Sequence, residues 1–265
     1  MTILAAKKHE MTPFGQLVET EDGSLTICHS AHAQNFHSTE GARLEAWQLY
    51  VVASGFLSEM SHPGHQVHVL DVGMGLGYNA AATIAAWVES SGDRDLRIVS
   101  LEVDELLVES VASGAAPWFL GWQDAWLLGP KALMRVSACE FMGTMTHGIS
   151  GKSCTWQILV GDGVKTLSCL TKGEFDYIWQ DPFTPDLNPT MWSPAWFSAL
   201  RERSAPEARL MTYSVARTVR DGLEGGGWLS EKIKTPTRKR QWTRAMNRVD
   251  GRSKKDRDLV EVRRP

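Results

Sequence analysis

The sequence predicts an α/β protein built on a mostly parallel β-sheet with helices on both faces. Short apolar runs typical of strands alternate with helical stretches, which is the pattern of successive β-α-β units. The runs are almost continuously apolar, as expected for strands that are buried on both sides. A glycine-rich segment, 73–77, joins the first of these runs to a helical stretch. Folds of this kind bind their ligands at such junctions.

Composition supports a single globular chain with a large core. The protein has 265 residues, of which 43% are hydrophobic and 22% charged, close to the averages for globular proteins. No window approaches the ~18 uninterrupted apolar residues of a membrane helix, and the N-terminus lacks the pattern of a secretion signal. The four cysteines show no CxxC spacing, so we expect reduced thiols, a cytoplasmic location and no metal site.

The strands are expected in a regular order along the chain. Residues 1–60 are interpreted as an N-terminal extension that packs on the core, with helical spacing beginning near Gly41. The main domain is expected over 61–265. Its β-rich apolar runs predict strands at 67–72, 97–103, 156–160, 175–179 and 208–213, with closing strands at 227–234 and 258–264.

The connections between these strands are mostly helical. We expect helices over 79–89 and from Asp104 onward. The segment 114–155 is longer than an ordinary connection and is interpreted as an insertion. It is rich in tryptophan, and we expect these rings to pack in the core rather than to form a lid over a site. The tryptophans are Trp118, Trp122 and Trp126.

Charge is unevenly distributed along the chain. The formal net charge is −3, but residues 231–265 hold 13 basic and 5 acidic residues. A basic C-terminal region on an acidic body indicates a docking face for a polyanion. Basic residues also abound on ordinary protein surfaces. A solvated tail is therefore an equally simple interpretation.

The glycine-rich turn is the strongest local signal for a ligand. Gly73, Gly75 and Gly77 follow the strand that ends in Asp71-Val72, and the next helix begins directly after them. Glycines let a backbone turn tightly and approach a ligand, and a helix N-terminus offers free N–H groups. The dinucleotide fingerprint requires a glycine at the position of Tyr78. The spacing therefore favours a nucleoside-type ligand without a pyrophosphate, although a purely structural turn has the same pattern.

Three carboxylates stand at or just beyond the carboxyl ends of three predicted strands. Glu102 stands where an acidic residue accepts hydrogen bonds from ribose hydroxyls, whereas Asp104 has the position of a helix cap. Asp162, beside Gly163, is placed to accept from an adenine amino group, or it forms an ordinary Asp-Gly turn. Asp181 lies in a loop that is stiffened by neighbouring prolines. We expect this acidic loop to receive an amine.

Five segments, in the same order, resemble the methyltransferase domain of the tRNA 5-methylaminomethyl-2-thiouridine biosynthesis protein MnmC. The sequence departs from the family pattern at Asp71, Pro182 and Thr237, where the family has Glu, Gly and Gly. The chain shows no second glycine-rich loop for an oxidase domain, so we expect a stand-alone methyltransferase. The segments are QNFHSTEGARLEAWQLYV, DVGMGLGYN, DYIWQDPFTPDLNPTMWSPAWF, TYSVARTVRDGLEGGGW and TRKRQ.

This resemblance implies a fold, a reaction and a set of site residues. The fold would be a Rossmann-like class I S-adenosylmethionine-dependent methyltransferase with a seven-stranded sheet whose final strand is antiparallel. The reaction would methylate the aminomethyl nitrogen of a modified wobble uridine in the anticodon arm of tRNA. Asp181 would be catalytic, either accepting the amine proton or orienting substrate and cofactor. The implied cofactor-binding residues are Gly73, Met74, Gly75, Gly77, Asn79, Glu102, Asp162, Gly163 and Asp181, and the implied tRNA-binding residues are Arg217, Arg238, Lys239 and Arg240.

Two other functions fit the same residues. An aminopropyltransferase of the spermidine-synthase type also places an acidic loop beside an amine, but the glycine turn lacks that family's acidic pattern. A non-catalytic RNA-binding module with the same fold is the third hypothesis. Weaker candidates for a role near the site are His37, Ser38 and Glu45. A cluster of histidines, His62, His65 and His68, has no visible fourth metal ligand.

Overall fold

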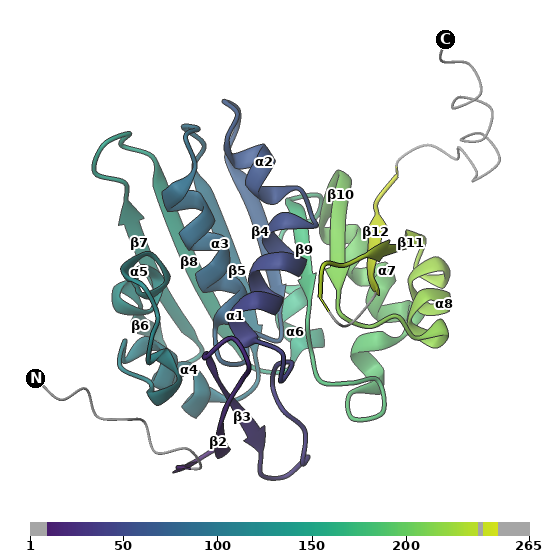
Figure 1. The fold of residues 1–265 in the computed structure, drawn as a ribbon. Coiled ribbons are helices and arrows are strands. Elements are labelled where there is room, and N and C mark those ends of the chain that lie inside the picture. Colours follow the sequence, from purple (N-terminus) through teal and green to yellow (C-terminus); the bar gives the residue numbers. More distant parts are fainter. Residues whose placement is uncertain (1–9, 238–240, 249–265) are drawn as a thin grey trace, which may run out of the picture.

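The structure is a computed structural model that describes residues 10–237 and 241–248. A nine-stranded sheet forms its centre, and a separate three-stranded sheet lies near the N-terminus (Figure 1). Five parallel strands occupy the middle of the large sheet and confirm the predicted α/β fold. In spatial order they are β10 (Ser204–Thr212), β9 (Phe175–Gln180), β4 (Val67–Val72), β5 (Leu96–Glu102) and β8 (Ser153–Val160).

The sheet has nine strands, so the expectation of seven is wrong. A hairpin of β6 (Met134–Ser137) and β7 (Glu140–Thr146) joins the edge of β8. Its first strand is fully exposed, and along its second strand buried and more exposed residues alternate. A strand with one solvent-exposed face lacks the continuous apolar run by which the central strands are recognised. This hairpin lies within the segment that was interpreted as an insertion.

The opposite edge of the sheet is completed by a strand that the sequence did not reveal. β12 (Gln241–Met246) runs antiparallel between β10 and β11 (Leu229–Lys234). Trp242, Thr243 and Ala245 are buried in it, whereas Arg244 is half-buried. The strand predicted at 258–264 lies outside the described residues.

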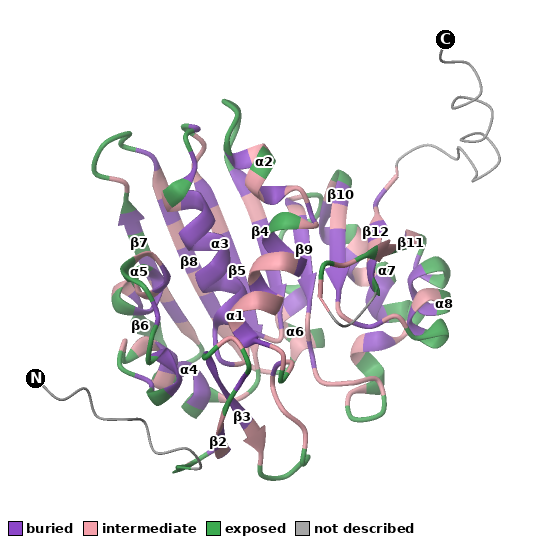
Figure 2. Ribbon diagram, viewed as in Figure 1, coloured by how far each residue is buried: buried purple, intermediate pink, exposed green. Residues whose placement is uncertain are grey.

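The helices divide between the two faces of the sheet, and each face has its own hydrophobic core. One core holds α3 (Tyr78–Glu89), α4 (Glu105–Ala112) and α5 (Asp124–Ala132), together with the N-terminal segment. The second core is formed mainly with α7 (Pro194–Arg203) and α8 (Arg217–Gly225), next to the short helix α6 (Gly163–Ser168). Figure 2 shows buried residues along the central strands and α3. The three tryptophans of the inserted segment are buried, as predicted.

The N-terminal segment is attached to the main sheet at a corner. Its strands are β1 (Met11–Thr12), β2 (Gly15–Glu19) and β3 (Leu25–His29). In the turn between β2 and β3, the Asp22 carboxylate accepts from the backbone N–H of Leu44, at 2.9 Å, in helix α1 (Ala42–Glu45). The chain continues into a π-helical stretch, η1 (Ala46–Val52), which packs against α3, and into α2 (Phe56–Met60). Two short 3₁₀ turns complete the set, η2 (Pro117–Phe119) and η3 (Pro189–Trp192).

This attachment brings the end of β3 to the same end of the large sheet as the loops after β4 and β5 (Figure 1). Within the described residues no helix has the length and apolarity needed to cross a membrane.

Candidate functional site

A cavity of about 660 Å³ opens at the carboxyl ends of the central parallel strands. Its volume is in the range of small-molecule sites. Three groups of residues form its wall: the loop after β3, the loops after β4, β5, β8 and β9, and Tyr213 beyond β10. Of the residues predicted for the site, Gly73, Gly75, Glu102, Gly163 and Asp181 line it. The structure therefore brings these five predicted residues together at one end of the sheet.

The glycine turn shapes the floor of this cavity through its backbone conformation. Gly73, Gly75 and Gly77 have φ angles of 78°, 54° and 84°, which L side chains rarely adopt. A Cβ on Gly73 would lie 2.9 Å from the Cα of Pro182, so the glycine allows the loops after β4 and β9 to touch. Met74 is buried and Gly77 packs against Val111, and neither lines the cavity. Cofactor contacts by these two residues stay predictions.

Glu102 is fixed at the rim of the cavity by backbone donors. Its Oε2 accepts from the N–H of Gly75 at 2.9 Å, and its Oε1 accepts from the N–H groups of Val103 and Asp104 at 2.8 and 3.0 Å. Burial raises the pKa of this carboxyl from its ordinary value. Asp104 caps α4 by accepting from the N–H of Leu106 at 3.0 Å, as its position in the sequence indicated.

Asp162 acts in the structure as a helix cap. Its Oδ1 accepts from the N–H of Lys165 at 3.1 Å at the start of α6. The cavity is lined here by Gly161 and Gly163, not by the carboxylate. A Cβ on Gly163 would lie 2.7 Å from the Cε of Met191, which also lines the cavity. Contact between Asp162 and an adenine ring stays a prediction.

Asp181 lies among polar side chains at the end of β9. Its Oδ2 accepts from the Nδ2 of Asn79 at 2.7 Å. Loss of water contact, together with the negative charge of Glu45, raises the pKa of Asp181 well above its ordinary value, while Asn79 and the Tyr50 hydroxyl act in the opposite direction. A carboxyl with a raised pKa is a better proton acceptor for an amine.

Tyr50 was not predicted from the sequence. The π-helical stretch η1 carries it into the core, where its side chain is fully buried. Its pKa is raised well above 10, first by burial and next by the charge of Asp181, so the phenol keeps its proton. Single π-helical turns occur frequently at functional sites. Here the turn points a neutral hydroxyl toward the acidic floor of the cavity.

Asp71 is fully buried and does not line the cavity. Its Oδ2 accepts from the Oγ of Ser100 at 2.7 Å, and the same Oγ accepts from the Nε1 of Trp156 at 2.9 Å. Burial, reinforced by the charge of Glu102, raises the pKa of Asp71 to about 7.

The raised pKa of Asp71 predicts a dependence of stability on pH. Between about pH 4 and 7 the folded state keeps a proton that the unfolded state releases, so this group destabilises the fold progressively as pH rises. A shift of about three units corresponds to roughly 4 kcal/mol above pH 7. We expect Asp71→Asn to unfold like the parent at pH 4 but to be more stable at pH 8, in urea titrations followed by circular dichroism. Parallel pH profiles for the two proteins would contradict the assignment.

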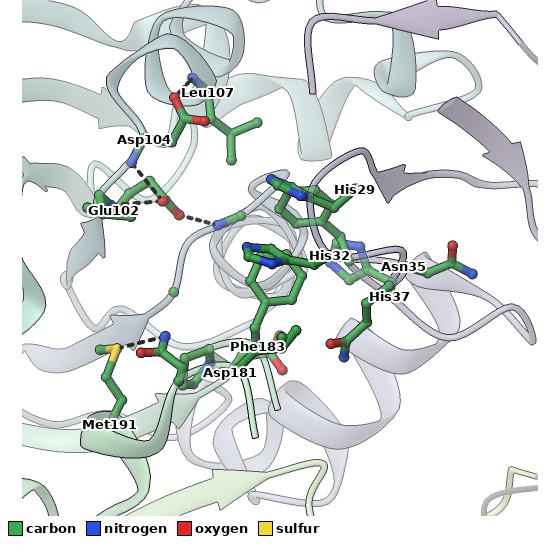
Figure 3. Close-up of a pocket in the computed structure, with 18 of the residues that line it drawn as sticks. His29, His32, Asn35, His37, Glu102, Asp104, Leu107, Asp181, Phe183 and Met191 are labelled. Carbon is green, nitrogen blue, oxygen red and sulfur yellow. Dashed lines mark hydrogen bonds between the residues drawn. The ribbon is translucent and has the colours of Figure 1, made fainter. Parts of the chain in front are cut away.

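The loop after β3 contributes residues that sequence reasoning largely overlooked. His29, His32 and Phe36 line the cavity and meet Phe183, which follows Asp181 (Figure 3). The region carried no periodic signal, because a loop that lines a pocket has no repeating buried face. His37, Ser38 and Glu45, which were weaker candidates, also line the cavity. Burial lowers the pKa of His37 to about 3, so its imidazole is neutral.

Other predicted residues lie elsewhere. Arg217 is exposed at the start of α8, where it pairs with Asp221 at 3.6 Å, and it does not line the cavity. Arg238, Lys239 and Arg240 lie outside the described residues. Across the part of the chain that the structure describes, no three His, Cys, Asp or Glu side chains are grouped to hold a metal ion. His68 instead contacts Glu174 at 3.2 Å.

The fold and the site together define the class. A glycine turn after the first central strand, a fixed carboxylate after the second and an acidic loop at the switch in strand order form the nucleoside-binding edge of a doubly wound sheet. Residues 131–248 match the family described as S-adenosyl-L-methionine-dependent methyltransferase. The chain is therefore an S-adenosylmethionine-dependent methyltransferase, and it is similar to MnmC proteins.

The relatives of the chain support this assignment. It is 30% identical over 227 residues to the tRNA 5-methylaminomethyl-2-thiouridine biosynthesis bifunctional protein MnmC of Azoarcus sp. (strain BH72), an alignment that covers 84% of the chain and 34% of that protein. The MnmC of Methylibium petroleiphilum is 31% identical over 198 residues, covering 74% of the chain and 29% of that protein. The chain therefore spans about a third of the length of these curated relatives.

Solved structures show the same fold. MNMC2 from Aquifex aeolicus superposes with a TM-score of 0.67 at 22% identity, covering 93% of this chain and 74% of that one. Spermidine synthase from Thermotoga maritima superposes with a TM-score of 0.54 at 12% identity, covering 98% and 79%. Both the methyltransferase and the aminopropyltransferase of the earlier hypotheses thus share this architecture.

The residues of the cavity fit S-adenosylmethionine, the cofactor of the family. Glu102 offers a fixed carboxylate for ribose hydroxyls, and the glycine turn leaves the space that a Cβ on Gly75 would enter. The Oδ1 of Asn79 is buried without a hydrogen-bond partner in the described residues. Such orphan polar atoms are costly unless a ligand or water completes them. The acidic floor matches a cationic sulfonium and amino group.

Proposed function

We propose that the protein transfers the methyl group of S-adenosylmethionine to the aminomethyl nitrogen of a modified wobble uridine in tRNA. The observation that carries the proposal is the acidic floor around Asp181, placed beside the glycine turn in an open cavity. The names of the aligned MnmC relatives, which refer to tRNA 5-methylaminomethyl-2-thiouridine biosynthesis, support the choice of acceptor.

The chain's own residues would prepare the amine for reaction. When bound, the cofactor supplies a methyl group on a sulfonium, which is a good leaving group, so alignment is the main task of the protein. A primary amine is largely protonated at neutral pH, as lysine is. Asp181, with its raised pKa, would accept the proton at its carboxylate, while Asn79 holds that carboxylate in place. Glu45 would add negative charge that attracts the cationic arm of the base.

The tRNA itself would be held largely through its phosphates. Arg217 on α8 and the exposed lysines of β11, Lys232 and Lys234, are the described basic residues that support such a face. The basic cluster at 238–240 continues it in the sequence. We infer that this face receives the anticodon arm.

A radiolabel transfer assay tests the proposal. The purified chain is incubated with labelled S-adenosylmethionine and tRNA that carries 5-aminomethyl groups at the wobble position. We expect label in the tRNA and, after nuclease digestion, in a methylaminomethyl uridine identified by mass spectrometry. The matched control is tRNA with unmodified uridine, which offers no amine. Transfer to putrescine from decarboxylated S-adenosylmethionine, with tRNA inert, would instead assign an aminopropyltransferase.

A further inference from the structure

Four rings gather over the cavity and join its two walls. His29 and His32 stack with centroids 4.5 Å apart and an interplanar angle of 19°. Phe183 meets both imidazoles, at 5.5 and 5.2 Å, and it meets Phe36 at 5.1 Å. Figure 3 shows His29, His32 and Phe183 between Glu102 on one side and His37 on the other. We call these four residues, His29, His32, Phe36 and Phe183, the ring cluster.

The ring cluster is suited to stacking rather than to proton transfer. The Nδ1 of His29 accepts from the N–H of Ala31 at 3.1 Å, which leaves the other ring nitrogen to carry the proton of a neutral imidazole. Partial burial and the neighbouring His32 lower the pKa of His29, so the imidazole of His29 is neutral at physiological pH. His32 is exposed and so presents part of its ring to solvent. Such surfaces bind the faces of nucleobases.

Amide side chains lie in the same cavity as the ring cluster. Gln34, Asn35 and Asn188 also line the cavity. Amide side chains both donate and accept, which is what the edge of a uracil requires. Beneath the rings lies the acidic floor at Asp181. The cavity therefore combines aromatic rings, amide groups and the carboxyl group of Asp181.

We propose that the ring cluster is the binding platform for the single nucleobase that carries the reacting amine. The base would leave its stack in the RNA and lie against His32 and Phe183, with its edge toward the amides and its amine arm toward Asp181. Enzymes that act on one base commonly hold it in this way, outside the helix. The proposal rests on the function proposed above, because it assumes that the acceptor is RNA.

The experiment compares two anticodon stem-loop RNAs that differ at one position. One carries 5-aminomethyluridine at the wobble position, and the other has an abasic site there. Binding of each to the full chain is measured by fluorescence anisotropy. Because stacking of one base contributes ~1–3 kcal/mol, we expect the parent protein to prefer the base-containing RNA by roughly 5- to 150-fold. His32→Ala should reduce that preference several-fold, and His32→Ala combined with Phe183→Ala should abolish it.

Controls separate the platform from other roles of the ring cluster. His32→Phe keeps an aromatic face and should retain the preference, and His65→Ala, an exposed histidine outside the cavity, should leave it unchanged. Affinity for S-adenosylmethionine should stay within twofold in His32→Ala, which removes an exposed side chain. If cofactor affinity falls while the RNA preference stays, the ring cluster covers the cofactor and the platform is wrong.

The failure of the two proposals can be told apart. If the parent binds both stem-loops and prefers the base, but the alanine variants keep that preference, the platform alone is overturned. If the parent neither binds nor methylates either RNA, the proposed acceptor is wrong, and the nucleobase platform falls with it.

Discussion

Asp181→Asn should lower the rate of methyl transfer to tRNA by at least about 100-fold, because it removes the group that accepts the amine proton. General base catalysis contributes typically 10²- to 10⁴-fold. The asparagine keeps the shape of the side chain and an oxygen that can accept from Asn79, so the fold is expected to survive. Single-turnover rates with bound S-adenosylmethionine measure the chemical step directly.

The control for this variant is Asp186→Asn, which removes an exposed carboxylate from the same loop. Its activity should equal that of the parent. The parent rate should also fall in acid through the raised pKa of Asp181, since the base must be unprotonated to act. Full activity in Asp181→Asn would exclude this residue as the proton acceptor. A loss of cofactor affinity with an unchanged rate would make it a residue that holds the cofactor.

Gly75→Val should weaken the binding of S-adenosylmethionine about 100-fold. At the φ of 54° a β-branched residue is strained, and its Cβ would lie 3.2 Å from the ring of Phe36. Strain of this kind costs ~1–3 kcal/mol. A shift of the turn would also break the hydrogen bond from the Gly75 N–H to Glu102, and hydrogen bonds to charged groups contribute ~1.5–3 kcal/mol. If these two effects together reduce the binding free energy of S-adenosylmethionine by about 3 kcal/mol, the affinity falls about 100-fold.

A strain-matched variant tests whether position matters. Gly151 has a φ of 73° with nothing within 4 Å of its Cβ, and it lies in the turn between β7 and β8. Gly151→Val should bear a similar backbone cost while its cofactor affinity, measured by calorimetry, stays at the parent value. Equal affinity in a folded Gly75→Val protein would show that the turn is structural only.

The central part of the fold could be predicted because short segments of the sequence carry the signal for each strand and turn. The strand at 67–72 was predicted with its observed bounds, and the turn after it was recognised from glycines whose positive φ angles the structure shows. A strand that is buried on both faces consists of consecutive apolar residues, which are easy to recognise in the sequence. In β7, next to one edge of the sheet, buried and more exposed residues alternate, and in β12, next to the other edge, charged and polar residues obscure the apolar buried positions Trp242 and Ala245.

The site could be predicted only where a residue directly follows a central strand. Glu102 and Asp181 stand at such positions, and both line the cavity. His32 reaches the same cavity, and Tyr50 reaches Asp181, through the packing of the N-terminal segment, which is a long-range contact without a local pattern. The electrostatic state of Asp181 was equally hidden, because it depends on burial and on Glu45, which is distant in sequence.

The place of β12 in the sheet has a consequence for how the protein is made. This strand enters between β10 and β11, although the ribosome delivers it after both. Until Gln241–Met246 emerges, the nascent chain presents the open edge of β10, next to its buried Leu210 and Met211. Open strand edges recruit other chains. Within the described residues β11 pairs with β12 alone, so it cannot protect that edge earlier. A chain whose translation stops before β12 is therefore expected to aggregate through the exposed edge of β10. By covering that edge, β12 keeps the described part of the protein from associating with other chains.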